Sequence, residues 1–134
     1  MNQRHHLSSL DAQAIIAAIQ AVLEREGRDA AVAVVDAQGE LIAFLRTDKC
    51  PLPSINNAIN KAYTAARERK PSAAVGHAAR VEGFAMTNFG DLRYTGWGGG
   101  VPVVYQGQVV GAVGVSGLPE AEDARLAELG AAVI

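Results

Sequence analysis

The residue of this sequence best placed to do chemistry is Lys61, which lies inside a segment with helical spacing of apolar residues. On a helical wheel it falls about 40° from Ala65, at the edge of the apolar stripe and not in the middle of the solvated face. A lysine there extends its aliphatic chain along the core and presents its ammonium at the rim of a pocket. It can contact an anion, or act as an acid or base if it is desolvated. The alternative is an ordinary lysine with a partly buried stem.

Arg46, Asp48 and Asp36 flank predicted strands, and the end of a sheet positions side chains well. The guanidinium of Arg46 can hold a ligand carboxylate through two parallel hydrogen bonds. A structural ion pair of Arg46 with Asp48 or Asp36 is an equally good interpretation. Asp36 also begins a turn, so it is either an acid or base of the site or a residue that stabilises the turn.

His77 is the one histidine inside a predicted folded segment, and a neutral imidazole is a good metal ligand. It lacks a second histidine at i+4, and His5 and His6 lie in a tail expected to be frayed, so no metal site is predicted. A packing or surface histidine is the alternative. Thr64 could give a ligand an oxygen contact, but it falls opposite the apolar stripe, so its burial would need a pocket between subunits.

The triplet Gly98-Gly99-Gly100 differs from a phosphate-binding loop, because neither a Lys-Ser/Thr pair nor a helix follows it. We expect a flexible start to a strand, or a place where the backbone approaches a ligand or another subunit. Tyr94 and Trp97 could wall an apolar pocket, although packing alone would also explain them. The predicted ligand region therefore combines Arg46, Lys61 and the triplet.

The elements that must position these residues alternate helices with two hairpins. In chain order they are a helix to Gly27, strands 31–35 and 41–45, helices 54–70 and 72–79, a loop over 82–98 with room for one short strand, a hairpin within 101–115, and a helix that starts near Pro119. Ser8, Ser54 and Ser72 are predicted helix N-caps. The early strands lack clean alternation, which predicts a sheet covered on both faces. Gly111 and Gly114 leave the last strand nearly bare, so a helix or a ligand packs close to it.

The composition predicts one domain, residues 1–134, because 49% of the 134 residues are hydrophobic and 19% are charged. The formal charge is −2 and the pI about 5.9, without a basic patch, so nucleic acid is not an expected partner. No apolar stretch is long enough to cross a bilayer, and the N-terminal residues lack the apolar region of a signal peptide. We expect a cytoplasmic protein without membrane contact, and the lone Cys50 excludes an internal disulfide.

Several segments, in this order and spacing, resemble the GlcG/HbpS family, which includes the C-terminal domain of PduO-type proteins. The matching residues are Val34-Val35-Asp36 with Gly39 and Leu41, Arg46 with Asp48, the run 57–65 around Lys61, Gly98-Gly99-Gly100-Val101-Pro102, the run 107–117, and Asp123. The resemblance implies a profilin-like α/β fold of the α+β kind, a three-layer α/β/α sandwich with an antiparallel sheet. It also implies homo-oligomers, often octamers, and haem as the ligand of some members.

These residues and the resemblance leave three functions open. The first is a cytoplasmic, homo-oligomeric protein that binds a small ligand, haem or a related tetrapyrrole, between subunits. Lys61 or Arg46 would then contact the propionates. His77 or Thr64 would lie near the iron. The second is a small catabolic enzyme of isomerase, tautomerase or hydrolase type, in which Arg46 binds a substrate carboxylate and Lys61 or Asp36 moves a proton. The third is a structural or regulatory oligomer without a ligand.

Overall fold

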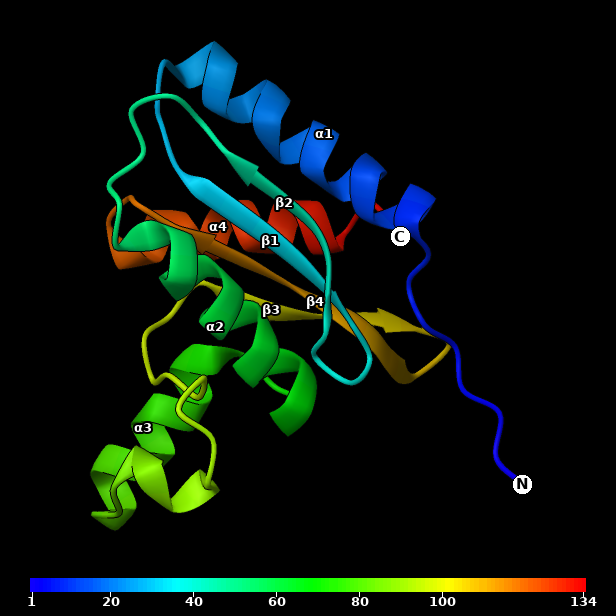
Figure 1. Cartoon of the computed structure of the whole chain (residues 1–134), viewed down its shortest axis with the longest axis vertical. Helices are drawn as coiled ribbons and strands as arrows, with labels where there is room; N and C mark the ends of the chain where they lie inside the picture. The colour runs from blue at the N-terminus through cyan, green and yellow to red at the C-terminus, as the bar shows by residue number, and fades with distance from the viewer.

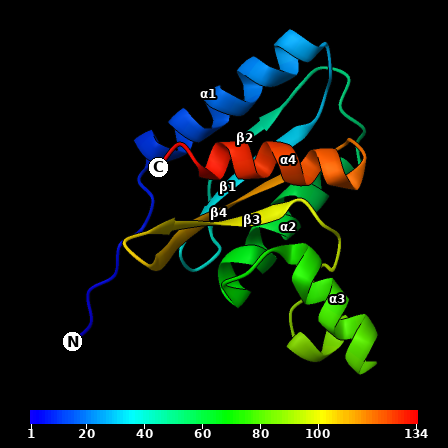
Figure 2. The same ribbon diagram turned by 180° about the vertical axis from the view of Figure 1, so that it is seen from behind.

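The computed structural model describes the whole chain, Met1–Ile134, as a four-stranded sheet with helices on both faces (Figures 1 and 2). In chain order the elements are α1 (Ser9–Glu26), β1 (Ala31–Asp36), β2 (Leu41–Arg46), α2 (Ser54–Glu68), α3 (Ser72–Glu82), the 3₁₀ helix η1 (Met86–Phe89), β3 (Gly100–Tyr105), β4 (Gln108–Ser116) and α4 (Glu120–Ala131). All strand pairs are antiparallel, in the order β2-β1-β4-β3. Helices α1 and α4 cover one face, and α2 covers the other, so the predicted α+β fold with three layers is confirmed.

The two faces of the sheet carry side chains of different size. On β1, Val32 and Val34 pack into the cluster with α1 and α4, whereas Ala31 and Ala33 pack against α2. Small side chains let α2 lie very close to the strands. A Cβ on Gly114 would overlap a backbone carbonyl oxygen of α2. Of the two explanations for the bare surface of the last strand, the closely packed helix is confirmed.

Local signals fix the ends of α1 and the second hairpin. The hydroxyl of Ser8 accepts a hydrogen bond from the Asp11 N–H, and the Asp11 carboxylate accepts one from the Ser8 N–H, which forms a capping box. Helix α1 ends at Gly27, whose φ of 65° is in the left-handed region. Gln106 and Gly107, with φ of 50° and 76°, form the tight turn between β3 and β4. These predictions are confirmed.

Three other local predictions are wrong. Ser54 and Ser72 are not N-caps, because Pro53 and Pro71 occupy those positions and neither serine forms a side-chain cap bond. The hydroxyl of Ser72 instead accepts a hydrogen bond from the Gly100 N–H at 2.9 Å, so a tertiary contact replaces the local one. The segment between α3 and β3 contains η1 but no strand.

No helix of the structure is both long and apolar enough to cross a bilayer.

Two segments that were expected to be open or loose are held by the same chain. Thr64 is fully buried, and its Oγ1 accepts a hydrogen bond from the Thr95 N–H at 2.9 Å, so a subunit interface is not needed to bury it. Residues 1–6 of the N-terminal tail are exposed, but the tail is held at Leu7, which is 5% exposed and whose N–H donates to the Val110 carbonyl oxygen at 2.9 Å. The tail therefore lies along the start of β4.

Candidate functional site

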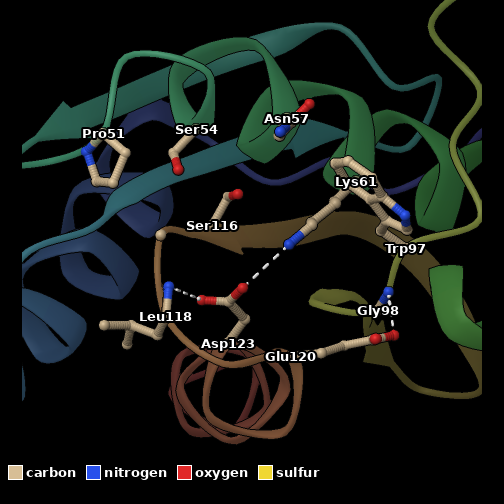
Figure 3. A pocket seen from close by; sticks show the side chains of 11 residues that line it. Pro51, Ser54, Asn57, Lys61, Trp97, Gly98, Ser116, Leu118, Glu120 and Asp123 are labelled. Atoms are coloured by element: carbon tan, nitrogen blue, oxygen red, sulfur yellow. Dashed lines mark hydrogen bonds and ion pairs between the residues drawn. The ribbon is translucent and has the colours of Figure 1, made fainter.

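A polar pocket of about 330 Å³ lies where α2 faces the turn between β4 and α4 (Figure 3). Only two of its eleven lining residues are hydrophobic. Helix α2 contributes Ser54, Asn57 and Lys61, and the end of β4 with the first turn of α4 contributes Ser116, Glu120 and Asp123. Because these segments are far apart in the sequence, only the folded chain forms this pocket.

An ion pair between Lys61 and Asp123 lies inside the polar pocket (Figure 3). The Nζ atom of Lys61 lies 3.1 Å from Oδ2 of Asp123 and also donates to the Val115 carbonyl oxygen at 3.1 Å. Both charged side chains are nearly buried, with 4% and 3% exposed. An ammonium has three N–H donors, so one direction of Nζ has no partner within the chain. Lys61 therefore lies deeper than the rim position expected for it.

The charges of this pocket disfavour an anionic ligand. Burial raises the pKa of the Asp123 carboxyl, and the Lys61 ammonium and the Leu118 N–H oppose that rise. Glu120 adds a second carboxylate, whose Oε1 accepts a hydrogen bond from the Gly98 N–H at 2.7 Å. Because Lys61 and Asp123 cancel each other, the net charge of the pocket comes from Glu120 and is negative.

The glycine triplet is required by the close approach of its backbone to α2 and β4. Gly99 has a φ of +123°, and a Cβ there would lie 2.6 Å from the Val115 carbonyl oxygen and 3.0 Å from Nζ of Lys61. A Cβ on Gly100 would overlap the Lys61 carbonyl oxygen. The backbone does approach another group closely, but the neighbours are Lys61 and Val115 of the same chain, where a ligand or another subunit was expected.

A larger cleft lies at the other end of β4, between the N-terminal tail and the β3–β4 hairpin. Its volume is about 810 Å³, and it adjoins a hollow of about 450 Å³ that His5 helps to line. The two share Gln3, Arg4 and Gln108, so we treat them as one site, the tail cleft. In Figure 1 the tail and the hairpin meet at the side of the sheet opposite the β4–α4 turn.

The tail cleft carries positive charge without carboxylate partners. Neither Arg4 nor Arg69, which both line it, forms a salt bridge within the chain. Burial lowers the pKa of Arg69, and the nearby guanidiniums of Arg4 and Arg67 lower it further. Nη1 of Arg69 donates to the Ala37 carbonyl oxygen at 2.9 Å, which fixes its position. Such a cluster suits an anionic group.

Apolar and aromatic side chains lie beside these cations. Val104 lines the tail cleft and is 55% exposed, and the next residue, Tyr105, is 43% exposed. The His5 ring packs edge-on against Tyr105, with 5.6 Å between the ring centroids. The tail cleft thus combines an imidazole, guanidiniums and apolar surface.

The structure separates Arg46 from Lys61. Arg46 lines a different hollow, formed with α1 and the segment after β2. It forms no salt bridge with Asp48 or Asp36. The predicted pocket of Arg46, Lys61 and the triplet is therefore corrected, because only Lys61 and Gly98 of this set line the polar pocket. The enzyme interpretation, in which Arg46 binds a carboxylate and Lys61 moves a proton, would need both side chains in one pocket, and they line different ones.

Asp36 and His77 also lie outside the polar pocket and the tail cleft. Oδ1 of Asp36 accepts hydrogen bonds from the N–H groups of Gln38 and Glu40 at 2.9 and 3.1 Å, which is turn chemistry. His77 is exposed on α3. No group of three or more His, Cys, Asp or Glu side chains is placed to hold a metal ion.

Sequence reasoning missed the partners that complete both sites. The sequence gives Asp123 only as one of the residues that match the GlcG/HbpS family, yet it is the partner of Lys61. The available signal in the sequence was Lys61 itself, since a lysine at the edge of an apolar stripe needs a carboxylate partner when it is buried. His5 was set aside with the tail, and Arg4 and Arg69 had no signal, because only the docked tail brings them together.

A match to a known protein family covers almost the whole chain. Residues 7–132 match the family described as haem-degrading, HbpS-like proteins. This chain belongs to the HbpS-like family. The matched residues include the helix of Lys61, the glycine triplet and Asp123.

This HbpS-like protein is similar to two curated relatives and two solved structures. Protein GlcG of Escherichia coli K12 is 39% identical over 117 residues, which cover 82% of this chain and 81% of GlcG. An uncharacterized 15.0 kDa protein of Citrobacter freundii is 39% identical over 99 residues, 71% of this chain and 68% of the relative. A double mutant of Streptomyces reticuli HbpS is 30% identical with a TM-score of 0.89, over 100% of this chain and 90% of that structure. A PduOC–haem complex shares the fold at a TM-score of 0.86 and 23% identity, over 96% of this chain and 95% of that structure.

Proposed function

We propose that this HbpS-like protein binds haem or a related tetrapyrrole in the tail cleft. The observation that carries the proposal is the pair of guanidiniums, Arg4 and Arg69, without carboxylate partners beside a cleft of about 810 Å³. The ligand class comes from the relatives, since the family is described by haem degradation and the PduOC structure is a complex with haem. The place of the ligand is argued from the residues of this chain.

The residues of the tail cleft fit haem, and those of the polar pocket do not. Haem is a flat, largely apolar ring with two carboxylates and an iron that accepts axial ligands such as imidazole. The tail cleft offers guanidiniums, valine side chains and the His5 imidazole. The polar pocket has about 330 Å³ against about 810 Å³, and it contains no imidazole or thioether. Its excess charge is also negative, which opposes the propionates.

In this proposal Arg4 and Arg69 bind the propionates through charged hydrogen bonds. Val104 and Val109 would contact the ring, and the imidazole of His5 would hold the iron. His5 takes the role considered for His77 and Thr64, because neither of those lines the tail cleft. Haem, when bound, supplies iron for redox or oxygen chemistry, and the chain binds and orients it.

A second copy of the chain would complete this site. The tail cleft lies beside β3, an edge strand of the sheet, where Val104 and Tyr105 are exposed. One face of a ring bound there would stay in water in a single chain, and apolar surface favours a covering partner. A homo-oligomer, with an octamer as one form, therefore belongs to the proposal. The cytoplasmic location expected from the sequence is kept as a separate part of it.

Titration with haemin tests the proposal. Wild-type protein should shift the Soret band and saturate at a fixed ratio of haemin to subunit. A charged hydrogen bond contributes about 1.5–3 kcal/mol. The double variant Arg4→Gln/Arg69→Gln should therefore bind at least about 100-fold more weakly. The matched control is Arg25→Gln/Arg80→Gln, which removes two exposed arginines elsewhere and should bind as wild type. No saturation, or equal affinity in the two double variants, would overturn the proposal.

A further inference from the structure

The polar pocket of Lys61 and Asp123 is separate from the proposed haem site. It lies at the Ser116 end of β4, and the tail cleft lies at the Gln108 end. β4 has nine residues, so these ends are roughly 27 Å apart at about 3.4 Å per residue. One ligand cannot occupy both sites. A buried ion pair adds little net stability to a fold, so stability alone is a poor reason to place this pair on a pocket.

Two polar groups that face the pocket have hydrogen-bonding capacity that the chain leaves unused. The first is Nζ of Lys61, which donates to the Val115 carbonyl oxygen and to Oδ2 of Asp123 and keeps one N–H direction open. The second is the hydroxyl of Ser116, which is 5% exposed and forms no hydrogen bond with the rest of the chain. Figure 3 shows the ends of the Lys61, Ser116 and Asp123 side chains gathered around the same space. A ligand with a polar oxygen would satisfy both free groups.

The lining defines the class of that ligand. A volume of about 330 Å³ lies at the lower end of the range of small-molecule pockets, and the mostly polar walls favour hydroxyl and carbonyl groups over hydrocarbon. The charge of Glu120 disfavours a carboxylate or phosphate. Trp97, which lines the pocket and is 62% exposed, leaves one side open to solvent. The ligand is therefore small and polar and carries no negative charge.

We propose that Lys61 forms a Schiff base with a small, uncharged aldehyde or ketone in this pocket. First, one proton passes from Nζ to Oδ2 of Asp123, 3.1 Å away, and leaves a neutral amine. The amine nitrogen then bonds to the carbonyl carbon, and one nitrogen proton moves to the carbonyl oxygen, which gives a carbinolamine. Asp123 returns its proton to that hydroxyl group. Water leaves as the carbon–nitrogen double bond forms.

The reaction balances and suits the buried pair. It begins with an ammonium, a carboxylate and a carbonyl compound, and it ends with a protonated imine, the same carboxylate and one water. The charge pair is therefore conserved in a site that would penalise an isolated charge. Burial raises the pKa of the Asp123 carboxyl, which favours its transient protonation. Ser116 is a positioning residue, whose hydroxyl donates to the carbonyl oxygen.

Reductive trapping with glycolaldehyde tests this proposal on the full chain. Sodium cyanoborohydride converts the imine into a stable amine, and peptide mass spectrometry then locates it. Lys49 and Lys70 are exposed and serve as internal controls. A positioned proton donor or acceptor accelerates such steps by about 10²–10⁴-fold, so we expect at least about tenfold more adduct on Lys61 than on either control. Faster labelling of Lys49 and Lys70, with Lys61 unmodified, would overturn the proposal.

Variants separate this chemistry from simple exposure. Asp123→Asn should reduce labelling of Lys61 by at least about tenfold. Glu122→Gln, a change one residue away that lies outside the pocket, should leave the labelling unchanged. Circular dichroism checks that each variant is folded. If Asp123→Asn does not fold, Ser116→Ala replaces it and should slow labelling without moving the melting temperature. Labelling equal to wild type in a folded Asp123→Asn or Ser116→Ala protein would contradict the proposed roles.

Discussion

Replacing Lys61 by methionine would leave the Asp123 carboxylate buried without its partner. Methionine keeps most of the length and volume of the side chain, so the packing of α2 on the sheet should survive. The Asp123 side chain is 3% exposed, and removing one member of a buried ion pair costs about 3–5 kcal/mol. The Leu118 N–H still donates to Oδ1 at 3.0 Å, which favours the lower end of that range. A loss of about 3 kcal/mol lowers the melting temperature of a domain of this size by about 10 °C.

Urea denaturation of this variant, followed by circular dichroism, measures that loss. The control is the double variant Lys61→Met/Asp123→Leu, which removes both charges and should recover most of the lost stability. Lys61 lowers the pKa of Asp123, so its removal raises that pKa further. The penalty in Lys61→Met should therefore shrink as the pH falls from about 7 to about 5, because protonation removes the buried charge. A loss below about 1 kcal/mol, or a double variant no more stable than the single one, would refute this reasoning.

Three further predictions follow from other contacts. Gly114→Ala should cost at least about 1–3 kcal/mol in urea denaturation, because its Cβ would overlap the Ala58 carbonyl oxygen; wild-type stability would contradict the close packing of α2. Burial raises the pKa of the Tyr63 and Tyr94 hydroxyls, so both should ionise above the ordinary phenol pKa. Their contribution to the free energy of unfolding is therefore complete below about pH 10 and is lost as the pH rises further. An alkaline absorbance titration in which all three tyrosines ionise together at the ordinary value would exclude this. The Arg93 guanidinium and the Tyr63 hydroxyl hold the pKa of Asp91 below its usual range. NMR should therefore find this carboxylate still ionised at a pH where an ordinary aspartate is protonated. Its contribution to stability should disappear only as the pH falls through that lowered pKa.

The parts of the fold that depend on neighbouring residues could be predicted from the sequence. The Ser8–Asp11 capping box and the Gln106–Gly107 turn each involve residues no more than three positions apart. Gly111 and Gly114 of β4 likewise predict a close contact from the sequence alone. Ser72 shows the limit of such reasoning, because a helix-capping hydroxyl is equally able to bind a distant backbone N–H, here that of Gly100.

The candidate sites could be predicted only in part, because their pairs are distant in the sequence. Lys61 and Asp123 are 62 positions apart, and no local pattern links an edge lysine to one particular acid. The tail cleft depends on the hydrogen bond between the Leu7 N–H and the Val110 carbonyl oxygen, which docks the tail on β4. Without that contact, the polar residues around His5 look like those of any frayed chain end. Which segments pack together is a property of the whole chain, and periodicity does not encode it.

We propose that haem binds in the tail cleft with His5 on the iron. The most direct measurement is the absorption spectrum of protein with one equivalent of haemin, compared between wild type, His5→Ala and the matched control His77→Ala. Wild type and His77→Ala should share one Soret spectrum, and His5→Ala should give a different one. Added imidazole should restore the wild-type spectrum of His5→Ala. A spectrum that is unchanged by His5→Ala, or changed by His77→Ala instead, would contradict this proposal.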